Sequence, residues 1–274
     1  RAHSMANGVN NSMSTEPKKL FSKENKAGDK FNYVRKLFHL VGLIVPFGYF
    51  FNLLDGISPW LFKETTRSII FWITGIITVF FLIIEFLRFR FKLWQDLFVK
   101  VAGPMLKGKE LDKMHGSVPY ILALCIVVGF FPREIAILSI LFLTFGDPAA
   151  ALVGGKYGTI RFYNGKSLQG TLGGMGGALI AGLIFLLLIS AAHVNSDFVL
   201  WDTHGIRLEN WVTLIIGSIV ALLIEFVSHE GFLDDNLTIP VGASLLMIGT
   251  HSLLSGHSIL TYFNSFGDLV RVIR

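Results

Sequence analysis

The sequence predicts an all-α, polytopic integral membrane protein with about seven transmembrane helices and a cytoplasmic N-terminus. Three observations lead to this class: 52% of the residues are hydrophobic, only 16% are charged, and the apolar residues occur in long blocks rather than at amphipathic spacing. With 274 residues of this composition, the chain has too much apolar surface for a single soluble core.

Seven apolar blocks approach the roughly 20 residues that a helix needs to cross a bilayer. They are residues 37–54, 68–87, 117–131, 135–153, 171–192, 211–227 and 237–254. The third block is short enough to be re-entrant, which leaves six spans as the alternative. With the N-terminus inside, 18 of the 24 Lys and Arg residues fall on the cytoplasmic side, as the positive-inside rule requires.

The chain divides into three parts. Residues 1–31 are polar and basic and are expected to form a disordered tail, the first few of them added rather than native. Residues 32–256 form the expected transmembrane catalytic domain, and residues 257–274 a C-terminal tail. The modest net charge of +5 lies beside the apolar blocks, which favours contact with membrane lipids and argues against nucleic-acid binding. A homodimer is left open.

The stretch 145–177 contains the first candidate site residues. Asp147 lies near the end of the fourth apolar block, where a carboxylate is costly unless it faces a polar cavity, a partner or a metal. The alternative is an acid that reaches the headgroup region. Gly154, Gly155 and Gly158 are expected in the loop that follows, where glycine lets backbone N–H groups approach phosphate oxygens.

Gly165, Lys166 and Ser167 precede the helix expected from about Thr171. Lys166 is expected to contact a phosphate group there, because the unpaired N–H groups of a helix start add positive potential. The alternative for Lys166 is an ordinary positive-inside residue. The small-x-x-x-small spacings of Gly170, Gly173, Gly174 and Gly177 favour close packing of two membrane helices.

Asp234, Asp235 and Asn236 follow the sixth apolar block. Their oxygen atoms suit Mg²⁺ that bridges a polyphosphate, and the alternative is a solvated turn. Arg35 and Lys36 open the first block and are expected to bind lipid phosphate or the nucleotide, or simply to anchor the helix. Under the predicted topology all these groups converge on the cytoplasmic face.

Five motifs together resemble the CTP-dependent lipid kinase family, which includes dolichol kinase, phytol kinase and the CTP-dependent diacylglycerol kinase of yeasts. They are R-K-L-F-H (residues 35–39), E-F-L-R-F-R (85–90), G-D-P-A-A-A-L-V-G-G-K-Y-G (146–158), G-K-S-L-Q-G-T (165–171) and D-D-N-L-T-I-P (234–240). Gln169 stands where many relatives have a glutamate, so no catalytic charge is expected at that position.

The resemblance implies transfer of the γ-phosphate of CTP to a lipid alcohol, such as diacylglycerol or a polyprenol, with Mg²⁺. Asp147 would be a metal ligand or the base, and Lys166 would contact phosphates. Asp234, Asp235 and Asn236 would complete the metal-nucleotide site, while Gly154, Gly155 and Gly158 would allow close backbone contact.

Two other functions remain as alternatives. A phosphatidate cytidylyltransferase would also use CTP, but its family has an L-D-R-x-D-S pattern where this chain has Asp234, Asp235 and Asn236. A non-catalytic membrane protein or transporter would be expected to have midplane charges or an inverted repeat. The expected location is a bacterial inner membrane or the endoplasmic reticulum, with the active site facing the cytoplasm.

Overall fold

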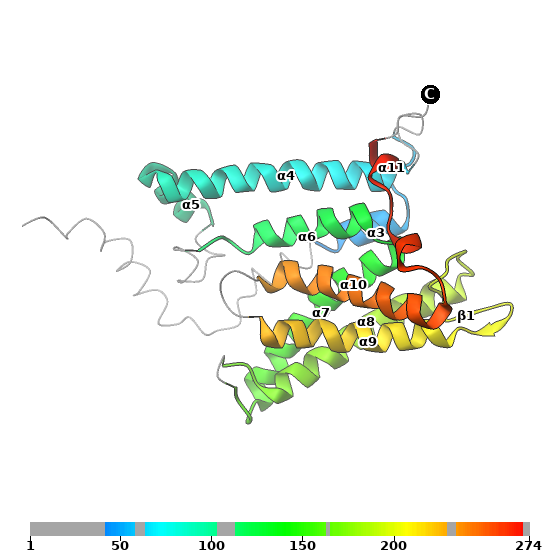
Figure 1. The fold of residues 1–274 in the computed structure, drawn as a ribbon. Helices are drawn as coiled ribbons and strands as arrows, with labels where there is room; N and C mark the ends of the chain where they lie inside the picture. Colours follow the sequence, from blue (N-terminus) through cyan, green and yellow to red (C-terminus); the bar gives the residue numbers. More distant parts are fainter. Residues whose placement is uncertain (1–41, 58–63, 103–112, 163–164, 229–233, 271–274) are drawn as a thin grey trace, which may run out of the picture.

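A computed structural model describes residues 42–57, 64–102, 113–162, 165–228 and 234–270, and these residues are mostly helical. The helices lie side by side in an elongated bundle (Figure 1), as the predicted all-α class requires. In chain order the elements are α3 (Ile44–Phe50), α4 (Thr65–Arg90), α5 (Lys92–Ala102), α6 (Ser117–Phe130), α7 (Arg133–Tyr157), α8 (Leu168–Ala191), β1 (Trp201–Asp202), β2 (Gly205–Ile206), α9 (Leu208–Val227), α10 (Asp235–Ser255), η4 (Ile259–Tyr262) and α11 (Phe266–Val270).

Within the described ranges, five helices are long and apolar enough to cross a membrane: α4, α7, α8, α9 and α10. The protein is therefore an integral membrane protein. The short third block forms α6, which has only 14 residues, and the described part of the first block contains only α3. The expected count of seven spans and the orientation of the N-terminus stay predictions. The described part of the expected C-terminal tail packs on the bundle, where Asn264 Nδ2 donates to the Phe131 carbonyl at 2.6 Å.

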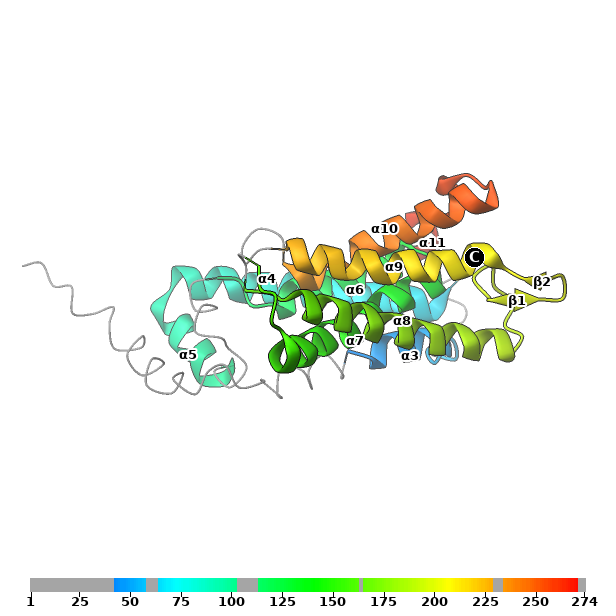
Figure 2. The ribbon, with the colours of Figure 1, turned by 90° about the horizontal axis from the view of Figure 1, so that it is seen from below.

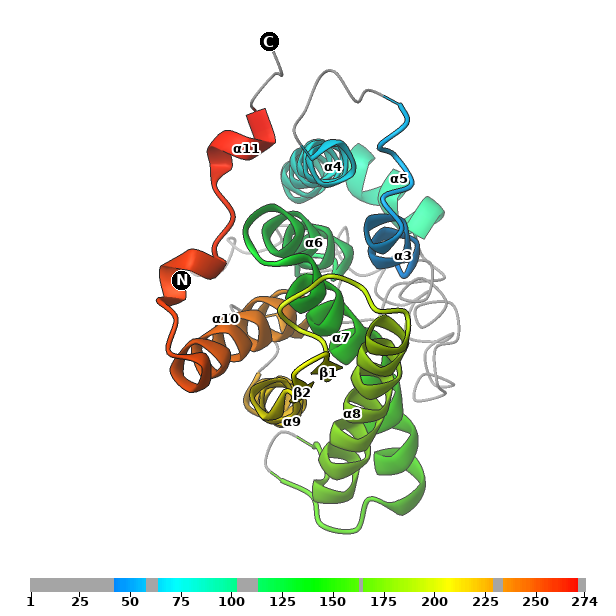
Figure 3. The same cartoon turned by 90° about the vertical axis from the view of Figure 1, so that its right-hand side faces the viewer.

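Helix α7 occupies the centre of the bundle. In the end-on view it lies among α3, α6, α8 and α10 (Figure 3). Of the 18 most apolar consecutive residues of α7, 61% are buried inside the bundle. In the corresponding stretches of the other four candidate spans, 22–44% are buried. Its side chains Leu138, Ile140, Phe142 and Leu143 are fully or almost fully buried and belong to the main hydrophobic core. The burial of α7 fixes the position of every functional group that it carries.

Helices α7 and α8 pack closely because glycines of α8 face α7. A Cβ atom on Gly177 would lie 2.7 Å from the Cβ of Ala149 and 3.2 Å from the Phe145 carbonyl oxygen. Gly170 is similarly close to the backbone of α7, 2.9 Å from the Ala150 carbonyl oxygen. This arrangement matches the packing interpretation of the small-x-x-x-small spacings.

Several helix ends meet at one end of the bundle. Helices α7 and α9 end there, and α8 and α10 begin there (Figures 1 and 2). The α7–α8 connection and the start of α10 therefore share this end, although they are distant in the sequence. We call it the site end.

The glycine packing can be tested with a matched pair of substitutions on α8. We expect Gly174→Ala to lower the free energy of unfolding by about 1–3 kcal/mol, the usual cost of overpacking. The new Cβ would lie 2.5 Å from Leu222 Cδ1, 2.9 Å from Ala150 Cβ and 3.1 Å from the Gly146 carbonyl oxygen. Gly176→Ala is the control, because its Cβ would meet open space. Thermal unfolding in detergent measures both, and equal midpoints would contradict the packing argument.

Candidate functional site

The site end contains a cavity of about 270 Å³ between α7, α8 and α9. Its lining residues are Asp147, Ala150, Ala151, Gly154 and Gly155 of α7, Arg161, Gly165, Lys166 and Ser167 of the connection, Gly170 and Thr171 of α8, and Glu225 of α9. The structure thus brings six predicted site residues to one cavity: Asp147, Gly154, Gly155, Gly165, Lys166 and Ser167. Of the predicted glycines, Gly158 does not line it.

The cavity lies along the side of α7 rather than beyond its end. The sequence analysis assigned Gly154 and Gly155 to a loop, but this is wrong because α7 continues to Tyr157. Asp147 is about ten residues before the end of α7, which corresponds to roughly 15 Å along a helix axis. Its carboxylate is therefore further from the end of its helix than predicted.

The connection between α7 and α8 is a small hairpin. Arg161 and Ser167 form an isolated antiparallel bridge, and the N–H of Phe162 donates to the Lys166 carbonyl at 2.9 Å. Gly165 has φ of +79°, in the left-handed region that favours glycine. The Arg161 guanidinium donates to the Gly165 carbonyl at 3.1 Å. These contacts hold two cationic residues, Arg161 and Lys166, at the cavity wall.

Gln169 fastens the start of this hairpin to the first turn of α8. Its Oε1 accepts hydrogen bonds from the N–H groups of Thr159 and Ile160, both at 3.2 Å. Its Nε2 donates to Thr159 Oγ1 at 2.6 Å. An amide is therefore suited to this position because it both accepts and donates, which a carboxylate cannot do.

Lys166 connects the hairpin to the end of α9. Its Nζ lies 3.6 Å from Glu225 Oε1 and 3.4 Å from Ser228 Oγ, and it donates to the backbone carbonyl of Glu225. The last carbonyl groups of a helix lack intrahelical partners and carry partial negative charge, which stabilises a cation. The ammonium group is thus held at the end of α9, beside the Glu225 carboxylate.

The predicted glycines divide into two kinds. Gly155 lines the cavity, and a Cβ on it would meet nothing within 4 Å. Gly154 also lines the cavity, but like Gly158 it packs against Ser167, whose Oγ would lie 2.9 Å and 2.7 Å from Cβ atoms on Gly154 and Gly158. Ser167 is the N-cap of α8 and accepts from the Gly170 N–H at 3.1 Å. Ser167 therefore has a structural role. Gly155 and Gly165 are the predicted glycines that line the cavity and have room for a ligand.

Asp234, Asp235 and Asn236 lie at the start of α10 at the site end, but they do not line the cavity. Asp234 is the N-cap of α10 and accepts from the Asn236 N–H at 2.9 Å. Asn236 is buried, and its Nδ2 donates to the Gly116 carbonyl at 3.3 Å. Asp234 and Asn236 therefore have structural contacts of their own. Arg35 and Lys36 lie outside the described residues.

Two charged residues of the cavity, Glu225 and Arg161, were not among the predicted site residues. Glu225 is the third residue from the end of α9, and it is buried. A carboxylate inside the sixth apolar block was a usable signal. There was little reason in the sequence to single out Arg161. It contributed only to the positive-inside count, as one of three Lys and Arg residues between the fourth and fifth apolar blocks.

The donor set of the cavity fits Mg²⁺ that is bound together with a polyphosphate. No group of three or more His, Cys, Asp or Glu side chains in the described ranges could hold a metal ion. The cavity does contain two carboxylates, Asp147 and Glu225, beside Lys166. Mg²⁺ typically takes one or two protein carboxylates and completes its shell with water and substrate phosphates.

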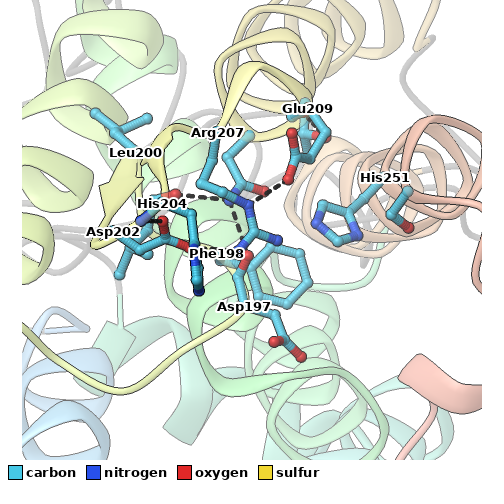
Figure 4. Close-up of polar contacts among 12 residues, drawn as sticks. Asp197, Phe198, Leu200, Asp202, His204, Arg207, Glu209 and His251 are labelled. Atoms are coloured by element: carbon cyan, nitrogen blue, oxygen red, sulfur yellow. Dashed lines mark hydrogen bonds and ion pairs between the residues drawn. The ribbon is translucent and has the colours of Figure 1, made fainter.

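A second polar cluster lies at the opposite end of the bundle, at the β1–β2 hairpin (Figure 4). Arg207 pairs with Asp202 at 2.8 Å and with Glu209 at 2.5 Å. The hydrogen bond from Arg207, with a further one from the His204 N–H, lowers the pKa of the Asp202 carboxyl. Because Arg207 pairs with Asp202 of β1 and Glu209 of α9, this cluster joins the hairpin to the start of α9 and is structural.

Comparisons with known proteins place these features in context. No family model matches the chain, and no solved structure matches it. It is 32% identical over 165 residues to CTP-dependent diacylglycerol kinase 1 of Schizosaccharomyces pombe, covering 60% of this chain and 72% of that protein. It is 29% identical over 170 residues to the Saccharomyces cerevisiae protein of the same name, covering 60% of this chain and 58% of that protein.

A more distant match is a probable chloroplastic phytol kinase of Zea mays, 26% identical over 204 residues, covering 71% of this chain and 63% of that protein. The chain thus spans less than two thirds of the S. cerevisiae and maize proteins.

The role of Gln169 as a fastener can be tested by hydrogen–deuterium exchange. We expect Gln169→Ala to raise amide exchange at Thr159 and Ile160 by roughly tenfold, because hydrogen bonds of about 0.5–1.5 kcal/mol each are lost. Gln169→Glu keeps the acceptor oxygen and should retain most of the protection. Unchanged exchange in the alanine variant would show that the hairpin is held by other contacts.

Proposed function

This chain belongs to the CTP-dependent lipid kinase family, and we propose that it transfers the γ-phosphoryl group of CTP to the hydroxyl group of a membrane lipid alcohol. Diacylglycerol and phytol are the acceptors named for its relatives. A polyprenol is a further candidate.

One observation carries the proposal: carboxylates, cations and an open glycine line one cavity at the end of an apolar bundle. Phosphoryl transfer needs positioning and charge neutralisation more than covalent chemistry. Lys166 and Arg161 supply positive charge for phosphate groups, and the backbone at Gly155 is open to close approach. Asp147 and Glu225 supply oxygen donors.

Helix α5 supports a membrane boundary at the site end. It follows α4 after the single residue Phe91 and turns away from the bundle there (Figures 1 and 2). Leu93, Leu97 and Val101 are exposed at i, i+4 and i+8, so they form one apolar stripe. Such a helix suits the interface between headgroups and acyl chains. The positive-inside count assigns this boundary to the cytoplasmic leaflet.

In the proposed reaction the lipid hydroxyl oxygen attacks the γ-phosphorus of CTP. The bond between that phosphorus and the β–γ bridging oxygen breaks, and CDP leaves. The Asp147 carboxylate accepts the hydroxyl proton or orients the hydroxyl group from the wall of α7. Lys166 contacts the phosphates, and Glu225 holds the ammonium group of Lys166 in place, 3.6 Å away.

In its alternative role, the Asp147 carboxylate would hold Mg²⁺, which would neutralise charge on the phosphate oxygens. Asp234 and Asp235 would contribute to the metal-nucleotide complex from the start of α10. Asn236 would position that helix start through its hydrogen bond to Gly116. Arg35 and Lys36 would add positive charge for phosphates from the start of the first apolar block.

The position of the label separates this reaction from its main alternative. CTP labelled at the γ-phosphate is supplied with diacylglycerol, phytol or a polyprenol, and the products are resolved by thin-layer chromatography. Label in the lipid supports the kinase. Label in pyrophosphate, released when phosphatidic acid is supplied, would support a cytidylyltransferase instead.

Asp147→Asn should lower the rate of transfer by about 10²–10⁴-fold, the usual contribution of a positioned proton acceptor, while the protein stays folded in detergent. Asp202→Asn is the matched control, because Asp202 lies in the cluster at the opposite end. Initial rates with saturating CTP measure both variants. Full activity of the Asp147 variant would remove this residue from the mechanism.

Lys166→Met should raise the KM for CTP by about 10–100-fold, because a hydrogen bond to a charged group contributes about 1.5–3 kcal/mol. Lys156→Met removes the same charge from the last turn of α7, outside the cavity lining. The KM of the Lys156→Met variant for CTP should stay within about twofold of that of the unmodified protein, since surface charges act weakly through solvent. Equal effects of the two substitutions would mean that Lys166 acts only through net charge.

A further inference from the structure

A buried ion pair lies in the last two turns of α4, at the site end of the bundle. Glu85 and Arg88 are almost fully buried, and Arg88 Nη2 lies 2.7 Å from Glu85 Oε2. Both belong to the E-F-L-R-F-R motif. Charged side chains are costly to bury, and replacing a buried ion pair with apolar residues of similar size is often neutral or stabilising. The stability of the fold therefore does not by itself account for this pair.

The pair holds the backbone of residues 113–116, which precede α6 and belong to no helix or strand. Arg88 Nη2 donates to the Lys113 carbonyl. Glu85 Oε1 accepts from the His115 N–H at 3.4 Å. Two side chains of α4 thus fix a segment that has no regular hydrogen-bonding pattern of its own.

Aromatic rings fix the orientation of the Arg88 guanidinium. Its Cζ lies 4.2 Å from the ring centroid of Phe89 and 4.7 Å from that of Phe98 in α5. The Phe98 ring also meets the His115 ring edge to face, with centroids 6.0 Å apart. A cation over an aromatic face is attracted to it, most strongly where water is excluded. Because the guanidinium is planar with donors in fixed directions, this enclosure also fixes the position of the Lys113 carbonyl.

The same segment contacts the start of α10. The Gly116 carbonyl accepts from Asn236 Nδ2 at 3.3 Å, and Asn236 is buried in the first turn of α10. The Asn236 N–H donates to Oδ1 of the N-cap Asp234 at 2.9 Å. The end of α4 and the start of α10 lie at the same end of the bundle (Figure 1). Hydrogen bonds and a short stretch of backbone thus connect the buried pair to the helix start that carries Asp234 and Asp235.

We propose, on the basis of the lipid kinase function above, that the Glu85–Arg88 pair positions the start of α10 and so places Asp234 and Asp235 for the metal-nucleotide complex. Neither residue of the pair lines the cavity, so both are positioning residues. Phosphoryl transfer depends on accurate placement of the nucleotide and the metal. Residues that orient metal ligands from outside the coordination shell typically contribute about 10–100-fold to metal affinity or activity.

The test replaces the pair with apolar residues. Glu85→Leu/Arg88→Met leaves no unpaired buried charge, so we expect the protein to stay folded in detergent. The Mg²⁺ concentration that gives half the maximal rate of transfer should rise by about 10–100-fold. The control, Glu64→Leu/Arg67→Met, removes an i,i+3 pair from the other end of α4 and should leave this concentration unchanged. A lower thermal stability of the Glu85/Arg88 variant with an unchanged Mg²⁺ requirement would show that the pair is only structural and would overturn the inference.

A second set of variants tests the route through Asn236. Asn236→Ala removes the hydrogen bond to Gly116 and should also raise the Mg²⁺ requirement. A protein that combines this change with Glu85→Leu/Arg88→Met should be affected no more than the worse of the two, because both changes interrupt one path. Effects that multiply would mean that the pair and Asn236 act independently, which contradicts the proposal.

If the apolar pair does not fold, Arg88→Lys takes its place in both sets of measurements. Lysine keeps a positive charge for Glu85 but lacks the planar set of donors that holds the Lys113 carbonyl. The Mg²⁺ requirement should rise in this variant too. An unchanged requirement would contradict the proposal.

Amide hydrogen exchange measures the same link without turnover. Removing the pair should raise exchange at His115 by about tenfold, because its N–H loses the Glu85 acceptor. Exchange should also rise at Thr238, whose N–H donates to the Asp234 carbonyl at 3.0 Å in the first turn of α10. Unchanged exchange at Thr238 would show that the pair does not position this helix start.

The two readouts separate the inference from the proposed function. If the unmodified protein phosphorylates a lipid alcohol and the pair variant has the same Mg²⁺ requirement, the positioning inference fails and the kinase stands. If exchange at Thr238 rises but the unmodified protein phosphorylates no lipid alcohol, the link between α4 and α10 stands. The proposed function then fails, and with it the assignment of Asp234 and Asp235 to a metal-nucleotide complex.

Discussion

The close approach of α7 and α8 is the constraint on which the rest of the structure depends. Glycines at the α8 face let the two backbones come nearer than side chains would allow, 2.9 Å from a Gly170 Cβ position to the Ala150 carbonyl oxygen. In a bilayer this matters more than in water, because apolar side chains gain little by leaving lipid. Backbone proximity also makes a short hairpin sufficient to join the helices, and it sets Lys166 opposite α9.

The same pair of helices separates the polar cavity of the candidate site from an apolar groove. One face of α7 turns Asp147 toward the cavity with Glu225 and Lys166. A different face of α7 turns Phe145 and Pro148 toward an apolar groove that α7 forms with α3 and α8. A lipid kinase must bring a water-soluble triphosphate and a membrane-bound alcohol together.

The predictions from sequence and the structure agree on which charged residues of α7 and the α7–α8 connection lie together. Asp147 and Lys166 were expected at one site, and both line the cavity. They differed where local geometry matters. Gly154 and Gly155 continue α7 instead of forming a loop, because backbone hydrogen bonding within a packed helix outweighs the weak helix propensity of glycine. Ser167 and Asn236 make structural hydrogen bonds to Gly170 and Gly116 that no spacing rule indicates.

The sequence by itself determined that this is a helical membrane protein with polar groups at its helix ends, because charges inside apolar blocks are costly and must serve a purpose. Only the tertiary structure decided which of those groups share a cavity. Glu225 and Arg161 line the cavity together with Asp147 and Lys166, whereas Asp234 and Asp235 do not line it. The physical reason is that contacts between distant segments depend on how helices pack, and that packing is set by shape across the whole core rather than by any local motif.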